Sequence, residues 1–308
     1  MIYIGIALLC LSYIFSQFFR SFLAVLSSQL SLDIGATADQ LALASGLWFL
    51  SFSAMQIPIG WSLDKCGPRL TAGLLVMVGG GGGAALFASA QAVWHVHLAM
   101  LLLGVGCAPV LMGAYFIFAR LYPAKVFATL AAVMVGVGSV GNLAGSAPLV
   151  SAVQVLGWRE AMALIAALSA AIGVGLLLFV RNPEPLTGKA QGSLLDLLRL
   201  RALWVILPLA LVSYAPAAGL RGVWIGPYLT AVHGADAAAV GRAAMIMSLA
   251  MIMGTFVYGP LDRIFKTRKW VVLGGNALGA LSLGVLGFVP QIGYTSAVTI
   301  FALVGFFG

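Results

Sequence analysis

Long apolar runs, separated by short polar or glycine- and proline-rich breaks, follow one another along the chain. Most are about as long as the ~20 residues that an α-helix needs to cross a bilayer. They predict an all-α polytopic membrane protein with nine full spans and the opening of a tenth. The predicted spans are 2–30, 41–62, 70–91, 94–120, 126–150, 160–180, 203–232, 239–260 and 270–290, with another helix starting near 294.

Composition agrees with this pattern. Of the 308 residues, 62% are hydrophobic and only 8% are charged, whereas a soluble domain has about a quarter charged residues. The net charge of +8 would suggest a nucleic-acid partner in a soluble protein. Here the positive residues gather in short loops, so we expect the lipid bilayer and not nucleic acid as the partner.

The distribution of lysine and arginine predicts the orientation. With a cytoplasmic N-terminus, twelve positive residues fall on the cytoplasmic side and only Arg159 and Arg242 on the other. This bias is the one that membrane proteins follow. The twelve are Lys65, Arg69, Arg120, Lys125, Arg181, Lys189, Arg199, Arg201, Arg263, Lys266, Arg268 and Lys269.

A short charged turn separates the second and third predicted spans. We expect Asp64 to precede a helix that begins near Pro68, because free backbone N–H groups favour a carboxylate there and proline needs no donor in a first turn. The turn contains, in order, Gly60, Asp64, Lys65, Gly67, Pro68 and Arg69.

This turn resembles the loop between the second and third helices of the major facilitator superfamily of transporters. Gly157-Trp158-Arg159, before the sixth predicted span, is similar to another mark of that superfamily. The resemblance implies twelve helices in two six-helix bundles, with the turn acting as a cytoplasmic gate.

The chain also divides as that resemblance implies. We expect a six-helix bundle at 1–181, a cytoplasmic linker with a short amphipathic helix at 182–202, and a partial second bundle at 203–308. A second acidic and basic turn, Asp262-Arg263, follows Arg221 by 41 residues, much as Asp64 follows Arg20 by 44. The resemblance implies the same gating role for this second turn. About nine to ten of twelve helices are present, so we expect a C-terminally truncated sequence.

Arg20 and Arg221 lie inside predicted spans, one in each half. A charge within the bilayer costs several kcal/mol or more unless it meets water, a polar partner or a ligand, and arginine does not discharge. Two such arginines suggest an anion site between the bundles, since the guanidinium fork suits phosphate or carboxylate. The alternative is that both bond other helices structurally.

Helical spacing adds four candidate substrate-binding residues. Tyr13 and Gln17 lie seven and three residues before Arg20, while Tyr214 lies seven before Arg221 and Trp224 three after it. Offsets of three and seven share a helix face. Packing or a position at the membrane interface would explain the aromatic residues equally well.

A narrower resemblance covers about residues 13–46. Tyr13, Arg20, Asp39 and Ser45-Gly46 look like the first two helices of the organophosphate:phosphate antiporters. That resemblance implies that Arg20 holds a substrate phosphate. Arg221 lies about one helical turn from the position where this family has its second arginine, so a carboxylate is the other candidate substrate.

Other reactive residues predict no further chemistry. His95 and His97 are placed in a short outer loop, His233 at the outer end of the seventh span, and the three cysteines fit no metal or disulfide spacing. The glycine run 79–83 and the glycines flanking Asn142 predict close helix packing. We expect no metal and no cofactor.

We therefore predict a monomeric secondary transporter of a small organic anion in a bacterial inner membrane. Two alternatives stay open: a transporter-like anion sensor, and an exporter of a neutral or cationic compound. A membrane enzyme would need a catalytic constellation, and the spans show none.

Overall fold

The computed structural model describes residues 2–184, 199–289 and 292–307. These residues contain helices and no strand. The first half contains α1 (Ile2–Phe18), α2 (Phe22–Ile34), α3 (Ala38–Ala54), α4 (Gln56–Lys65), α5 (Gly67–Leu75), the π-helix η1 (Val76–Gly81), α6 (Gly82–Ala88), α7 (Val93–Leu121), α8 (Ala124–Ala144), α9 (Ala147–Leu156) and α10 (Trp158–Phe179). The second half contains α12 (Arg201–Gly219), the π-helix η2 (Leu220–Trp224), α13 (Ile225–His233), α14 (Ala237–Ile264), α15 (Arg268–Phe288) and α16 (Tyr294–Phe307).

These helices confirm the polytopic membrane fold. Within the described residues, seven helical stretches are long and apolar enough to cross a bilayer, when α3 with α4 and α5 with η1 and α6 are each counted as one. The bent pair α1–α2 makes an eighth if it is counted as one span. The predicted seventh span corresponds to α12, η2 and α13, and the predicted start near 294 corresponds to α16. Many large apolar side chains are exposed, such as Leu32 at 86% and Phe288 at 89%, as expected for a surface that faces lipid.

The first predicted span is wrong in one respect, because it is broken rather than continuous. A turn at 19–21 separates α1 from α2, and the two helices meet at a bend of 49°. The Ser21 hydroxyl donates to the carbonyls of Phe18 and Gln17, at 3.3 and 3.5 Å. Such bonds from serine back to the preceding turn bend helices. Arg20 lies within this break.

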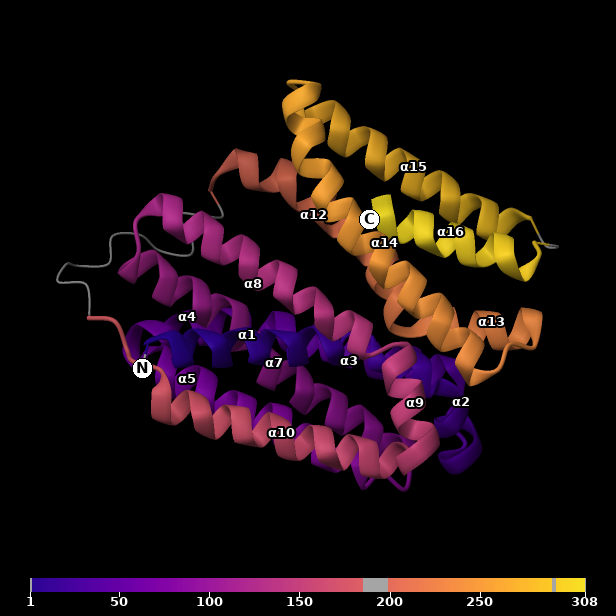
Figure 1. Cartoon of the computed structure of the whole chain (residues 1–308), viewed down its shortest axis with the longest axis horizontal. Helices are drawn as coiled ribbons and strands as arrows, with labels where there is room; N and C mark the ends of the chain where they lie inside the picture. The colour runs from indigo at the N-terminus through magenta and orange to yellow at the C-terminus, as the bar shows by residue number, and fades with distance from the viewer. Residues whose placement is uncertain (1, 185–198, 290–291, 308) are drawn as a thin grey trace.

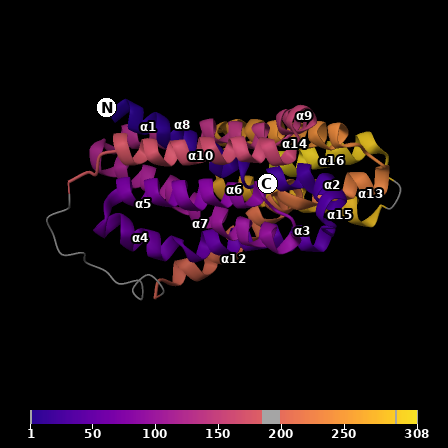
Figure 2. The ribbon, with the colours of Figure 1, turned by 90° about the horizontal axis from the view of Figure 1, so that it is seen from below.

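The two halves meet through a limited set of helices. Helix α2 of the first half contacts η2, α13 and α14 of the second, α3 contacts η2, and α8 and α9 contact α14. We call the end that holds Asp33, Trp158 and His233 the Asp33 end, and the opposite end the Asp64 end. Figure 1 shows α8 and α14 spreading apart toward the Asp64 end, and Figure 2 gives the view from below.

The domain boundaries at 181 and 203 remain predictions. The amphipathic helix expected at 194–201 falls almost entirely outside the described residues, since the structure does not describe 185–198. The close packing expected of the glycine run 79–83 is confirmed, because Gly79 and Gly83 lie directly against the backbone of α7. Aromatic rings fill the core where α2 begins: Phe18, Phe19, Phe22 and Phe87 contact one another in sequence.

Candidate functional site

A cavity of about 320 Å³ lies between the two halves and contains both intramembrane arginines. Its wall comes from α1 and α8 on one side and from η2, α14 and α16 on the other. This volume is near the lower end of the range for ligand pockets, ~300–1,000 Å³. The cavity therefore suits a small metabolite.

Arg20 reaches the cavity from the break between α1 and α2. Its guanidinium carbon lies 5.1 Å from the ring centre of Trp48 and 4.9 Å from that of Phe52. These two rings, both on α3, are themselves stacked at 5.0 Å. A cation over aromatic faces is stabilised without losing its charge. The two stacked rings therefore hold the guanidinium of Arg20 in place while it stays cationic.

Arg221 reaches the same cavity from the π-helix η2 and is only 2% exposed. One terminal nitrogen lies 3.5 Å from the sulfur of Met251 on α14. Short π-helical segments are rare and often occur at functional sites. Both arginines thus lie at irregular points of their helices, a broken helix in one half and a π-helix in the other.

Three helices present residues to the cavity at the same spacing. From α1 and the break that follows it they are Tyr13, Gln17 and Arg20; on α8 they are Val135, Ser139 and Asn142; on α14 they are Met251, Thr255 and Tyr258. Each set follows i, i+4 and i+7, which is one face of a helix. The amide nitrogen of Gln17 donates to the Tyr13 hydroxyl at 2.9 Å.

Of the six residues predicted to bind substrate, four therefore line one cavity: Tyr13, Gln17, Arg20 and Arg221. Trp224 does not, and it is 44% exposed while Arg221 is buried. The shared face expected for this pair is wrong because the π-helix winds more widely, so an offset of three no longer aligns. The side chain of Tyr214 lies outside the described part of the structure.

Sequence reasoning missed Ser139, Thr255 and Tyr258, and did not include Asn142 among the predicted binding residues. The signal was available, because each of these polar residues interrupts an otherwise apolar span at helical spacing from another cavity residue. What the sequence does not show is which helix face points inward.

The charged turn is built differently from the expectation. Helix α4 continues through Lys65, so Asp64 lies in its last turn and does not cap α5. Asp64 instead pairs with Arg120 at the end of α7, at 3.5 Å. The backbone N–H of Arg69 donates to Asn182 at 3.0 Å, and its side chain donates to the carbonyl of Leu177. The turn is thus tied to other helices of its own half.

Among the other predicted gate residues, Lys65 is exposed and Gly60 lies within α4. Asp262 and Arg263 belong to α14, but their side chains are not described. A gating role for these residues remains a prediction.

Replacing Gly67 with alanine should lower the stability of the turn. Gly67 has φ of +81°, and an added Cβ would lie 2.5 Å from the Asn182 side chain that binds Arg69. Left-handed backbone alone costs about 1–2 kcal/mol for a residue with a Cβ. Gly60→Ala is the matched control, since nothing lies within 4 Å of its added Cβ. Thermal unfolding in detergent should show a loss for Gly67→Ala only; equal melting temperatures would contradict the assignment.

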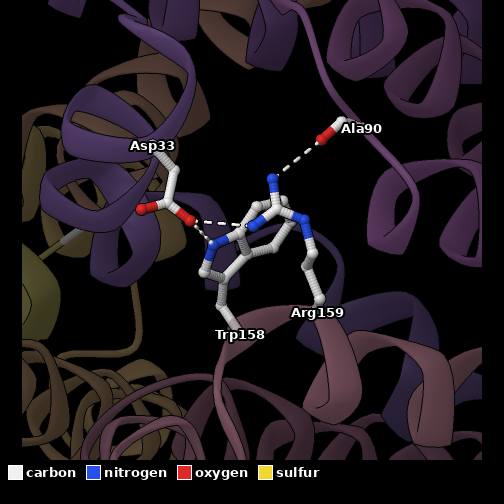
Figure 3. A network of polar contacts seen from close by, with 4 residues as sticks. All are labelled: Asp33, Ala90, Trp158 and Arg159. Carbon is white, nitrogen blue, oxygen red and sulfur yellow. Dashed lines mark hydrogen bonds and ion pairs between the residues drawn. The ribbon is translucent and has the colours of Figure 1, made fainter.

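A second polar network ties the Asp33 end of the first half together (Figure 3). Asp33, near the end of α2, accepts hydrogen bonds from the Trp158 indole and from Arg159, both at 2.8 Å. Arg159 also donates to the carbonyl of Ala90 at 3.1 Å. The Gly157-Trp158-Arg159 motif thus anchors α2, the part of the first span that contacts the second half.

Other candidate features do not form a competing site. A larger hollow of about 660 Å³ between α6 and α10 is lined almost wholly by alanine and glycine, with Ser89, Arg159 and Glu160 as its polar residues. His95 and His97 lie in the first turns of α7 and not in a loop, which corrects their predicted position. His97 pairs with the carbonyl of Gln40 at 3.0 Å. In the described ranges, no three His, Cys, Asp or Glu residues come together as metal ligands would.

Comparison with known proteins gives a family match over nearly the whole chain. The profile of the Major Facilitator Superfamily matches residues 9–308. The "Putative tartrate transporter" of Agrobacterium vitis is 23% identical over 300 residues, covering 87% of this chain and 66% of that protein. The "Probable L-galactonate transporter" of Escherichia coli (strain K12) is 26% identical over 290 residues, covering 84% and 59%.

A solved structure agrees in fold. A bacterial homolog of the human lysosomal transporter Spinster, in an inward-facing and occupied conformation, superposes with a TM-score of 0.76 at 19% identity. The match covers 98% of this chain and 71% of that one. The chain thus spans about 59–66% of the length of the two curated relatives.

Proposed function

This chain belongs to the Major Facilitator Superfamily, and on that premise we propose that it is a secondary transporter of a small organic anion, and not an enzyme. One observation carries the proposal: Arg20 and Arg221, from different halves, line one cavity of about 320 Å³. A carboxylate accepts paired hydrogen bonds from a guanidinium fork. The relatives named for tartrate and galactonate, both carboxylates, favour that class over organophosphates.

The arrangement of the halves suggests how transport proceeds. The halves contact through α2, α3, α8 and α9 of the first half and η2, α13 and α14 of the second, and α8 and α14 diverge toward the Asp64 end. An anion that enters between them would bind one arginine from each half and draw the halves together. Rocking of two repeats about a central site is a general route to alternating access.

We place the protein in a bacterial inner membrane, with its N-terminus and the Asp64 end cytoplasmic, because positive loops favour that side.

Binding to the purified chain tests the proposal. Succinate, glycerol 3-phosphate and neutral glycerol are titrated into the protein in lipid nanodiscs. The proposal predicts saturable binding of succinate that salt weakens and no binding of glycerol. Binding of the phosphate ester alone would favour the organophosphate alternative. Binding of glycerol but neither anion would contradict an anion site.

The sensor alternative rests on the same cavity but predicts no net movement of ligand. Uptake of the bound anion into proteoliposomes by the protein at its natural length separates the two: accumulation supports a transporter, and binding without uptake at equal protein loading supports a sensor.

A further inference from the structure

The cavity wall is not uniformly cationic, because polar groups beside the arginines act as hydrogen-bond acceptors. The side-chain amide oxygens of Gln17 and Asn142 are buried, and neither accepts a hydrogen bond from any described residue. Both side chains line the cavity and are only 8% and 7% exposed. A buried acceptor left unsatisfied costs about 1–3 kcal/mol, so such atoms indicate that something else donates to them.

Two hydroxyl groups extend this acceptor surface. Ser139 donates its proton to the carbonyl of Val135 at 3.2 Å, and Thr255 donates to the carbonyl of Met251 at 3.0 Å. A hydroxyl that has given its only proton to the backbone offers only lone pairs to a ligand. Ser139, Asn142 and Thr255 come from α8 and α14, while Gln17 comes from α1.

An ionised carboxylate is only a hydrogen-bond acceptor and has no proton to donate. It therefore satisfies none of these four acceptor groups. The arginines supply donors for the carboxylate, and the four acceptors require donors on the rest of the ligand. Hydroxyl groups and ammonium groups both donate. The cavity-lining residues that the structure describes carry two positive charges and no carboxylate, which disfavours an ammonium group.

We infer that the substrate is a hydroxylated carboxylate, and that Asn142 and Gln17 are the residues that recognise its hydroxyl groups. This inference rests on the proposed function, since it names the substrate class of the same site. The carboxylate binds Arg20 and Arg221, while hydroxyl groups donate to the amide oxygens of Asn142 and Gln17. Ser139 and Thr255 provide further acceptors for additional hydroxyls.

Four acids with the same four-carbon skeleton test the inference on the full chain in lipid nanodiscs. Succinate has no hydroxyl group, malate has one, tartrate has two, and aspartate has an ammonium group in place of the hydroxyl of malate. We expect affinity to rise from succinate to malate to tartrate, by roughly threefold to tenfold for each hydroxyl. Aspartate is expected to bind more weakly than malate.

Two variants assign the effect to residues. Asn142→Leu keeps the volume but removes the acceptor, and should lower the ratio of tartrate affinity to succinate affinity by roughly tenfold. Gln17→Met should act in the same direction. Asn276→Leu is the matched control, because Asn276 lies on α15, outside the cavity lining, and bonds the carbonyl of Val272 in its own helix. Size-exclusion chromatography and thermal unfolding show whether each variant is folded.

The outcomes separate this inference from the proposed function. If the wild-type protein binds succinate as tightly as tartrate, water satisfies the acceptors and the inference is overturned while the anion site stands. Equal losses for tartrate and succinate in Asn142→Leu would make Asn142 structural. Aspartate binding more tightly than malate would assign the acceptors to an ammonium group. No binding of any of the four acids would count against the proposed function itself.

Discussion

Removing the charge of Arg221 is expected to weaken binding of the organic anion by at least tenfold. A hydrogen bond to a charged group contributes about 1.5–3 kcal/mol, which corresponds to about 10- to 150-fold in Kd. Arg221 is 2% exposed and lines the cavity, so little water screens it. Arg221→Met should show the full loss. Arg221→Lys keeps the charge but not the fork, and should recover only part of it.

Arg20 should behave in parallel, with one difference. Its guanidinium lies over Trp48 and Phe52, so Arg20→Met also removes a cation–π contact worth about 0.5–2 kcal/mol. We therefore expect Arg20→Met to lower both anion affinity and thermal stability.

Arg242→Met is the control for both substitutions. Arg242 is an exposed residue of α14 and does not line the cavity. Titration of tartrate into each variant, with folding checked by size-exclusion chromatography, gives the comparison. The anion site would be refuted if both arginine variants bound tartrate as tightly as the wild type and Arg242→Met.

The largest effect on stability is expected at Gly141. An added Cβ there would overlap the carbonyl oxygen of Ile14 on α1, which is backbone and has little room to move. Overpacking of this kind costs about 1–3 kcal/mol, and small residues allow membrane helices such as α1 and α8 to approach closely. Gly141→Ala should therefore lower the melting temperature and disturb the cavity that α1 and α8 share.

Gly136→Ala on the same helix is the matched control. Nothing lies within 4 Å of its added Cβ, and alanine favours a helix over glycine by about 1 kcal/mol. We expect its melting temperature to equal or exceed that of the wild type. Equal destabilisation by the two substitutions would show that the α1–α8 contact is not what makes Gly141 necessary.

Much of the fold could be predicted from hydropathy, because a bilayer allows few alternatives to long apolar helices. The spans and the division into two halves follow from run length and loop charge. The break at Arg20 could not be predicted in this way. No proline or glycine marks it, and the bend depends on where the Ser21 hydroxyl bonds.

The candidate site was predictable only in its charged part. An arginine in an apolar span is conspicuous, so Arg20 and Arg221 stand out, and helical spacing adds Tyr13 and Gln17. Neutral residues such as Ser139 and Thr255 are common in membrane helices. Their roles depend on which helix face borders the cavity, and tertiary packing decides that. The same packing exposes Trp224, which sequence spacing had placed beside Arg221.

The most direct test of the central claim is to locate a bound anion. Crystals of the protein soaked with bromosuccinate, a carboxylate that carries an anomalous scatterer, show where the ligand binds. We expect an anomalous peak in the cavity between Arg20 and Arg221 that disappears in crystals of Arg221→Met. A peak at another place, unchanged by that substitution, would contradict it.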